Sequence, residues 1–293
     1  MNTTKQIAVI GGDARYLDMI KMLTKQSNNH IQAVGFDQLD QGFTGVKQVD
    51  FEDLDLKSLD AVILPIPGTD DDGYIETVFS GKQIKITTDW LKKLPSHCVV
   101  FSGIANDYLI NCVKEASLKL TPLMNRNDVA IYNSIPTVEG TIMIAIQNTD
   151  FTIHSSNIIV LGLGRVGLSV ASKLSMLGAN VYVGSKKKED LARAYEMGLT
   201  PFHIKDLSAY TSNCDMLINT VPAKVVTADS IKPMKSHTLI IDLASKPGGV
   251  DFDYAKKRGI KALHSLGLPG IVAPKTAGEI LGTVINQILT EQV

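Results

Sequence analysis

The sequence is poor in cysteine, aromatic residues and net charge. Its 293 residues include three cysteines, Cys98, Cys112 and Cys214, with no CxxC pair and no paired histidine spacing. We therefore expect no disulfide framework and no metal site, and a reducing cytoplasm as the location. The net charge of −1 and the aromatic share of 6% argue against nucleic-acid binding. Because we find no secretory signal and no apolar run of about 18 residues, we expect no membrane insertion.

What the sequence does contain is a series of short apolar runs that alternate with segments of helical periodicity. Continuous apolar runs are typical of strands covered on both faces, as in parallel sheets with crossover helices. They lie at residues 7–10, 31–34, 61–64, 84–86, 99–101, 157–161, 181–183, 216–219, 238–242 and 261–263. The pattern predicts an α/β protein with two doubly wound parallel-sheet domains, the second a Rossmann domain that binds NAD(P).

Helical patterns lie at the boundaries of these domains. We predict an N-terminal substrate-side domain at residues 1–130, a linking helix at 131–150 and a Rossmann domain at 151–275. A C-terminal helix at 276–293 is expected to return to the domain interface.

The motif Gly162-Leu163-Gly164-Arg165-Val166-Gly167 follows one of the apolar runs and opens a helical segment. In a dinucleotide-binding turn the first glycine permits the tight turn and the second lets the backbone approach a pyrophosphate. The third allows the helix to pack closely on the strand, and N–H groups at the helix start bind the phosphates. We therefore predict that these six residues bind the cofactor. The alternative is a cluster of packing glycines without a ligand.

A similar stretch at residues 11–16 departs from this pattern. Counted from Gly11, its second and third glycine positions hold Asp13 and Tyr16. A carboxylate there would repel a pyrophosphate, and a large ring would hold the helix off the strand, so we expect no dinucleotide at this turn. Asp13 and Arg15 are candidates for facing the substrate; the alternative is a helix cap and a surface charge.

The residues that follow the run at 181–183 bear on the choice of cofactor. NAD-selective sites usually place Asp or Glu at the end of this strand to bind the ribose 2′-OH. Here Ser185 and Lys186 are followed by two more lysines, and no carboxylate precedes Glu189. A hydroxyl and lysines suit a 2′-phosphate, so we predict NADP, with NAD as the alternative. A solvated basic helix start would be compatible with either.

Several longer segments carry a resemblance to a known family. They are NSIPTVEG at residues 133–140, GLGRVG at 162–167, NTVP at 219–222, DLASKPGG at 242–249 and GLPGIVAPKTAG at 267–278. In this order and spacing the chain resembles the family of dipicolinate synthase A subunits over essentially its full length. The cofactor half is also similar to shikimate dehydrogenase, although the catalytic Lys and Asp context of that family is not found in the first domain.

The resemblance implies an activity and a partner. It implies NAD(P)-dependent formation of pyridine-2,6-dicarboxylate from a hydroxytetrahydro- or dihydrodipicolinate precursor during sporulation. It also implies that the partner is the flavoprotein-like B subunit of dipicolinate synthase, and a homo-oligomer is possible. Two other hypotheses stay open: a dehydrogenase of another small hydroxy acid, and a nucleotide-binding scaffold that only activates a partner.

Further candidate residues follow from the rule that ligands bind beyond the carboxyl ends of parallel strands. On this ground Asp242 is expected near the reacting end of the cofactor; the alternative is a carboxylate that anchors a loop. Asn219 is either a cofactor contact or a turn residue. The predicted cofactor contacts at strand ends are Asn219, Thr220, Val221, Leu243, Ala244 and Gly267.

Two predicted helix starts suggest a site for a substrate with two carboxylates. Pro274 fits a first helical position, which places Lys275 and Thr276 in the first turn. A cation there opposes the helix dipole unless an anion binds. The other start is predicted at residues 133–137, where Ser134 and Thr137 could hold a carboxylate. Ordinary capping is the alternative at both.

The oxidation also requires a group that removes a proton. His264 ends a predicted strand just before the 267–278 segment, and an imidazole takes up protons near neutral pH. We predict His264 as this catalytic base, with Asp242 and Lys246 as rivals. A structural role is the alternative for a lone histidine at a strand end.

Overall fold

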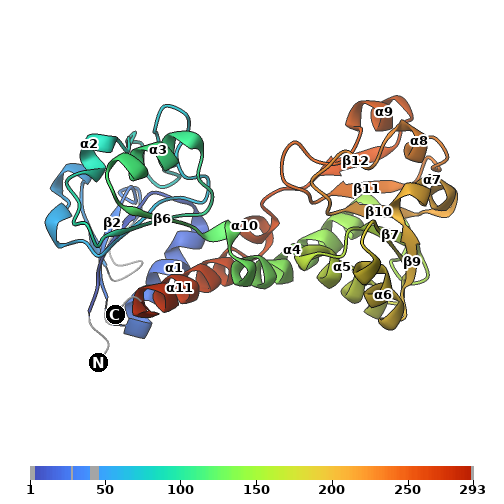
Figure 1. Ribbon diagram of the computed structural model, residues 1–293, viewed down its shortest axis with the longest axis horizontal. Coiled ribbons are helices and arrows are strands. Elements are labelled where there is room, and N and C mark those ends of the chain that lie inside the picture. Colours follow the sequence, from blue (N-terminus) through green and yellow to red (C-terminus); the bar gives the residue numbers. More distant parts are fainter. Residues whose placement is uncertain (1–3, 28, 40–45, 292–293) are drawn as a thin grey trace. The chain divides into compact units, whose positions relative to one another are not determined.

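The computed structural model describes residues 4–27, 29–39 and 46–291. The chain divides into two compact units: unit 1 comprises Met1–Tyr132 and Ala273–Val293, and unit 2 comprises Asn133–Val272. Within the described residues each unit has one six-stranded sheet flanked by helices (Figure 1). The predicted class of two doubly wound α/β domains is confirmed, and both sheets have the strand order of a Rossmann fold.

The sheet of unit 1 has the order β3-β2-β1-β4-β5-β6, with all neighbours parallel. Its strands are β1 (Gln6–Ile10), β2 (His30–Val34), β3 (Lys47–Gln48), β4 (Ala61–Ile63), β5 (Val99–Ser102) and β6 (Lys119–Pro122). Its helices are α1 (Ala14–Ser27), α2 (Thr88–Leu91), α3 (Asp107–Glu115) and α11 (Pro274–Glu291), with the 3-10 turns η1 (Phe51–Asp53), η2 (Leu56–Ser58) and η3 (Leu123–Asn125).

Hydrophobic layers cover both faces of this sheet, because successive strand residues point to opposite sides. Ile7 and Val9 of β1 pack in the layer formed with α1 and α11. Ala8 and Ile10 pack in the layer formed with α2 and α3. All four side chains are 0% exposed, which explains why the strand forms a continuous apolar run in the sequence.

The C-terminal helix α11 lies along α1 (Figure 1). We expected this helix at the domain interface; the structure assigns it to unit 1. The two helices approach closely at Gly278, where a Cβ atom would lie 2.1 Å from the carbonyl oxygen of Arg15. The residues that α11 adds to the core of unit 1 are Leu281, Val284, Ile285, Ile288 and Leu289.

One predicted strand of unit 1 is wrong. Residues 84–86 form no ladder, apart from an isolated antiparallel bridge between Tyr74 and Lys85. Ile84 and Ile86 are still buried, at 4% and 0% exposure, because the segment packs in the layer that contains α2. The apolar pattern there indicates burial and not strand pairing.

Unit 2 repeats the plan with the order β12-β11-β10-β7-β8-β9, again all parallel. Its strands are β7 (Asn157–Leu161), β8 (Asn180–Ser185), β9 (Thr200–His203), β10 (Met216–Asn219), β11 (Leu239–Asp242) and β12 (Lys261–His264). Its helices are α4 (Asn127–Asn148, which begins in unit 1), α5 (Arg165–Met176), α6 (Lys188–Glu196), α7 (Leu207–Tyr210), α8 (Ala228–Ile231), α9 (Phe252–Lys257) and α10 (Leu268–Val272), with the 3-10 turns η4 (Ile204–Asp206) and η5 (Thr211–Asn213).

Helix α4 is long and apolar enough, by length and composition, to cross a membrane, although we expected no stretch of that kind. Its apolar residues have packing roles within the chain. Val129 is 0% exposed in the core of unit 1, and Val138 and Ala145, at 4% and 0% exposure, lie in the core of unit 2. Core packing therefore accounts for part of the hydrophobicity of this helix, whereas Ile131, Ile135 and Ile146 are exposed.

Candidate functional site

The glycine turn of unit 2 connects β7 to α5 as the motif predicts. Gly162 has φ +84°, a backbone conformation that L side chains rarely adopt. At Gly167 a Cβ atom would lie 2.1 Å from the carbonyl oxygen of Gly162. These two glycines therefore serve the turn and the close approach of helix to strand.

Gly164 has a different environment from its neighbours. It is exposed and forms the N-cap of α5, with ordinary dihedral angles (φ −76°) and no side-chain cap. A Cβ atom there would meet nothing within 4 Å, and the first turn of α5 contains no acidic residue. Open space in front of an uncapped helix N-terminus fits a pyrophosphate. The other motif residues, Leu163, Arg165 and Val166, are respectively buried, exposed and half-buried.

The carboxyl ends of four strands meet beside this turn in one row. In the parallel register Leu161 of β7 pairs with Asn219, Asn219 with Asp242, and Asp242 with His264. These strand-end residues therefore share one edge of the sheet, and their roles toward the cofactor stay predictions.

The side chain of Asp242 connects the end of β10 to the loop that follows β11. Its side chain is 0% exposed. Its Oδ1 accepts hydrogen bonds from Asn219 Nδ2 (2.8 Å) and Ala244 N (3.1 Å), and its Oδ2 accepts one from Gly249 N (2.7 Å). A carboxylate with three donors and no exposed surface acts as an anchor for the following loop, so the geometry favours the anchoring alternative over a role as base.

Asn219 and Thr220 are used mainly in the turn that follows β10. The Asn219 amide is 0% exposed, accepts from Val221 N (3.1 Å) and donates to the Val221 carbonyl oxygen (3.0 Å). Thr220 Oγ1 donates to the Leu161 carbonyl oxygen (2.8 Å). A Cβ atom on Gly162 would lie 2.8 Å from Thr220 Oγ1. Thr220 therefore supports the glycine turn from the neighbouring strand.

His264 is half-buried at the end of the row. Its Nε2 lies 2.8 Å from the carbonyl oxygen of Ala244, and its ring centroid is 5.7 Å from that of Phe252. A carbonyl oxygen only accepts, so Nε2 carries the proton and Nδ1 is the accepting nitrogen of the neutral ring. Lys246 is exposed in the loop after β11, and Gly267 is exposed after β12. Leu243 is half-buried, and its N–H donates to the Asn219 carbonyl oxygen (2.8 Å).

The end of β8 contains an interaction that the sequence did not reveal. Ser185 is buried; its hydroxyl donates to Asp190 Oδ2 (2.6 Å) and accepts from Lys187 N (3.2 Å). Lys186 and Lys187 are exposed. Asp190 lies in the first turn of α6, so the helix brings a carboxylate back to the strand end. The only available signal was its position soon after Ser185 in a helix start.

In unit 1, Asp13 and Arg15 pair with each other. Arg15 Nε lies 2.9 Å from Asp13 Oδ1, and Arg15 Nη2 lies 2.5 Å from Oδ2. Burial by itself would raise the pKa of Asp13, but hydrogen bonds and charge from Arg15 outweigh it and hold the pKa below its usual value. This pairing favours the alternative of a cap and a local charge over a substrate role.

The predicted helix start at residues 133–137 is wrong. Helix α4 begins at Asn127 and contains Pro136 in its interior, because the helical pattern continues back to the buried Val129. No helix-terminal N–H groups are therefore present there to bind a carboxylate. Ser134 Oγ lies 2.8 Å from Ser169 Oγ, and Thr137 Oγ1 donates to the Asn133 carbonyl oxygen (2.7 Å).

The other predicted helix start is confirmed. Helix α11 begins at Pro274, and Lys275 and Thr276 are exposed in its first turn, which contains no acidic residue. The helix N-terminus and the Lys275 ammonium are both favourable for an anion. Substrate binding by Lys275 and Thr276 stays a prediction.

Comparisons with known proteins agree over the whole chain. A family model for the N-terminal domain of the dipicolinate synthase A subunit matches residues 6–124, and one for the alanine dehydrogenase/PNT C-terminal domain matches residues 130–291. The dipicolinate synthase A subunit of Bacillus subtilis (strain 168) is 52% identical over 291 residues, which cover 99% of this chain and 98% of that protein.

Two crystal structures extend this similarity to the fold. The dipicolinate synthase A subunit from Bacillus halodurans has a TM-score of 0.94 at 54% identity, and the match covers 99% of both chains. The dipicolinate synthase A chain from Bacillus subtilis has a TM-score of 0.95 at 51% identity, covering 99% of this chain and 97% of that one. The glycine turn, the strand-end row and these matches lead to one conclusion: this chain belongs to the family of dipicolinate synthase A subunits.

Proposed function

We propose that this chain is the A subunit of a dipicolinate synthase and oxidises a dihydrodipicolinate precursor to dipicolinate (pyridine-2,6-dicarboxylate), with NADP as the hydride acceptor, during sporulation. The observation that carries the proposal is the row from Asn219 to His264 beside a glycine turn with open space at Gly164. The support from relatives is the 52% identity to a protein named for this synthase.

The chemistry requires few groups from the protein. The dihydro ring loses one hydride and one proton and becomes an aromatic pyridine; a hydroxytetrahydro precursor loses water first. A bound nicotinamide supplies the hydride acceptor. The chain must therefore hold the substrate, exclude water and accept one proton.

His264 Nδ1 is our proposed proton acceptor. The Ala244 carbonyl oxygen holds the Nε2 proton, which leaves Nδ1 as the basic atom of the neutral ring. Ala244 N is in turn bonded to Asp242, so the buried carboxylate positions the histidine through the intervening backbone. Lys246 is the rival base, because it is exposed on the same loop.

Glutamine is the most informative replacement for His264, because its amide nitrogen keeps a donor for Ala244 while the basic nitrogen is lost. We expect His264→Gln to lower kcat by about 10²-fold or more, the usual contribution of a general base. Binding of NADP should not change. Lys246→Met is the matched comparison, and a larger loss of kcat there would transfer the role to Lys246.

NADP is proposed over NAD because Lys186 and Lys187 are exposed at the end of β8 and can pair with a 2′-phosphate. Asp190 opposes this choice, although its carboxylate already accepts the Ser185 hydroxyl. The ratio of dissociation constants for NADP and NAD decides the question. Replacement of Lys186 and Lys187 by alanine should weaken NADP and leave NAD unchanged; an equal effect on both would contradict the assignment.

The partner and the location complete the proposal. We propose that this chain assembles with a flavoprotein-like B subunit, on the strength of the relatives' designation as the A component of the synthase. We also propose the cytoplasm, since Cys98, Cys112 and Cys214 are all buried free thiols, as suits a reducing compartment.

The deciding assay follows both products of the reaction. The purified chain, alone and with a candidate B subunit, receives NADP and an enzymatically generated precursor. We expect reduced nicotinamide and the ultraviolet absorbance of the pyridine dicarboxylate to rise together. If NADP binds but neither signal rises, with or without the B subunit, the result would favour a nucleotide-binding scaffold.

A further inference from the structure

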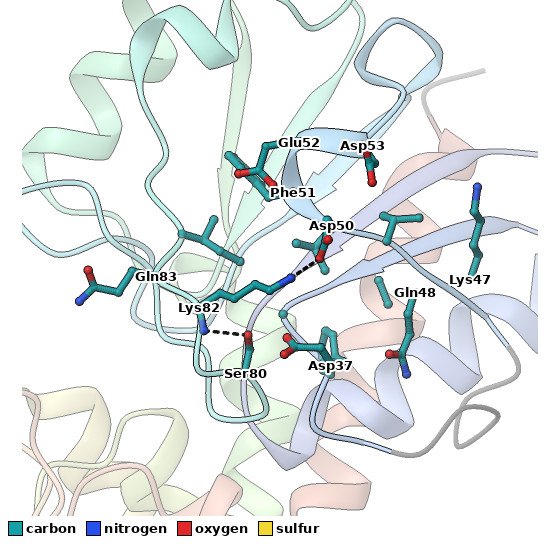
Figure 2. A pocket seen from close by; sticks show the side chains of 16 residues that line it. Asp37, Lys47, Gln48, Asp50, Phe51, Glu52, Asp53, Ser80, Lys82 and Gln83 are labelled. Carbon is teal, nitrogen blue, oxygen red and sulfur yellow. Dashed lines mark hydrogen bonds and ion pairs between the residues drawn. The ribbon is translucent and has the colours of Figure 1, made fainter.

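Unit 1 contains a cavity of about 560 Å³ outside the site described above. It lies at the carboxyl ends of β2 and β3 (Figure 2). Its volume is within the range of small-molecule sites. The full lining is formed by Ala33–Asp37, Lys47–Asp53, Ser80 and Lys82–Ile84.

The position of this cavity in the sheet points to a class of ligand. The two units share one strand order, so β2 in unit 1 corresponds to β8 in unit 2. In a Rossmann fold the adenosine half of a dinucleotide binds beyond this strand, and an acidic residue after it binds the ribose hydroxyls. In unit 1 the residue at that place is Asp37, shortly after β2 ends at Val34. Among the described residues the Asp37 carboxylate has no hydrogen-bond partner.

The pyrophosphate half of such a site is closed by the chain itself. The N–H of Gly11 donates to the Val34 carbonyl oxygen (2.8 Å), and that of Gly12 donates to the Glu76 carbonyl oxygen (3.0 Å). A Cβ on Gly11 would lie 2.4 Å from the same Glu76 oxygen. The Asp13 carboxylate accepts the Arg15 N–H (3.0 Å) at the start of α1. The N–H groups of Gly11, Gly12 and Arg15 are therefore already bonded within the chain, and the Glu76 carbonyl oxygen stands close to the turn where a phosphate would approach.

The cavity wall combines apolar surface with polar groups. Phe51, Val49 and Ile84 provide apolar area that suits the face of a base. Ser80 is 8% exposed; its hydroxyl accepts the Lys82 N–H (3.1 Å) and retains a proton for which the described residues provide no acceptor. Lys82 reaches toward Asp50, with which it forms an ion pair (Figure 2).

The charges that remain disfavour an anionic ligand. With Lys82 paired to Asp50, the lining still carries the exposed carboxylates of Asp37, Glu52 and Asp53 against one lysine, Lys47. An added phosphate would be repelled by this excess. We propose that this cavity binds a nucleoside without phosphate, with the ribose hydroxyls on Asp37 and the base against Phe51.

Calorimetric titration of adenosine into the full-length chain saturated with NADP tests this proposal. Saturation with NADP first occupies the glycine turn of unit 2, so binding there cannot be mistaken for the new site. We expect one saturable adenosine site. AMP and 2′-deoxyadenosine should each bind at least tenfold more weakly, because one adds an anion and the other removes a hydroxyl from Asp37.

Two variants give the matched comparison. Asp37→Asn should lower adenosine affinity at least tenfold, whereas Asp72→Asn should leave it unchanged, since Asp72 is exposed and outside the cavity. Amide exchange should slow in residues 80–84 and 47–53 when adenosine binds. The proposal is overturned by the absence of saturable binding at millimolar adenosine, by equal effects of the two variants, or by loss of binding when NADP is present.

Discussion

Replacing Gly164 with alanine should leave unit 2 folded and weaken the binding of NADP. Gly164 has φ −76°, is exposed, and offers open space where a Cβ atom would stand. The native conformation is therefore open to alanine. The loss of chain freedom in the unfolded state, worth up to about 1 kcal/mol, is offset by the poorer fit of alanine than of glycine to an N-cap, so we expect little change in stability. If a pyrophosphate lies against this backbone, the new methyl group takes its place. We expect the dissociation constant for NADP to rise at least tenfold, about 1.4 kcal/mol.

Gly167→Ala is the matched comparison, because this substitution should lower the stability of unit 2. The new Cβ would lie 2.1 Å from the Gly162 carbonyl oxygen and 3.0 Å from Thr220 Oγ1. The nearest atom belongs to the backbone of the turn, so relief requires the helix to move. Overpacking of this kind costs about 1–3 kcal/mol or more, and each kcal/mol should lower Tm by about 2–4 °C.

Thermal unfolding and fluorescence titration with NADPH measure the two effects separately. The reasoning predicts normal Tm with weak binding for Gly164→Ala, and a lowered Tm for Gly167→Ala. A Gly164→Ala protein that binds NADPH as tightly as the original chain would refute a pyrophosphate at this turn. A Gly164→Ala protein that unfolds early would refute the geometry given for its backbone.

Three further predictions concern groups outside the glycine turn. Lys275→Met should raise KM for the dicarboxylate at least tenfold in steady-state assays without changing NADP affinity, because the ammonium is predicted to bind substrate; equal effects on both would contradict this. Burial raises the pKa of the Cys98 and Cys214 thiols to about 12, so iodoacetamide near neutral pH should label them only after denaturation, and rapid labelling of native protein would count against their burial. The folded pKa of Asp13 is lowered despite burial by its bonds to Arg15, so its stabilising effect is complete above the ordinary pKa of 3.8 and is lost as pH falls through the lower folded value. Urea midpoints of Asp13→Asn and the original chain should therefore differ near neutral pH and converge in acid, and a constant difference would refute this.

Most of the sheet could be predicted from apolar runs, because strands buried on both faces must be apolar throughout. The short edge strands β3, β6 and β9 could not, since their sequences, KQ, KLTP and TPFH, contain no continuous apolar run. The opposite error occurred at residues 84–86, where Ile84 and Ile86 are buried without strand pairing. Apolar periodicity indicates burial, and hydrogen-bond partners depend on the rest of the fold.

The candidate site shows the same division. The register that aligns Asn219, Asp242 and His264 follows from their positions at the ends of parallel strands, which the sequence displays. The tie between Asp190 and Ser185 depends on where α6 begins, and the sequence indicates that start only approximately. The helix start at Pro136 was misplaced because a proline suits a first turn, whereas α4 accommodates it internally.

The assignment of α11 to unit 1 bears on the order in which the protein folds as it is synthesised. Unit 2 is continuous in sequence, while unit 1 needs both ends of the chain. The ribosome therefore synthesises all of unit 2 before α11. Until α11 is made, part of the apolar surface of unit 1 stays uncovered. A nascent chain that stops at Val272 should accordingly be cut by proteases within residues 1–132, whereas residues 133–272 should resist cleavage.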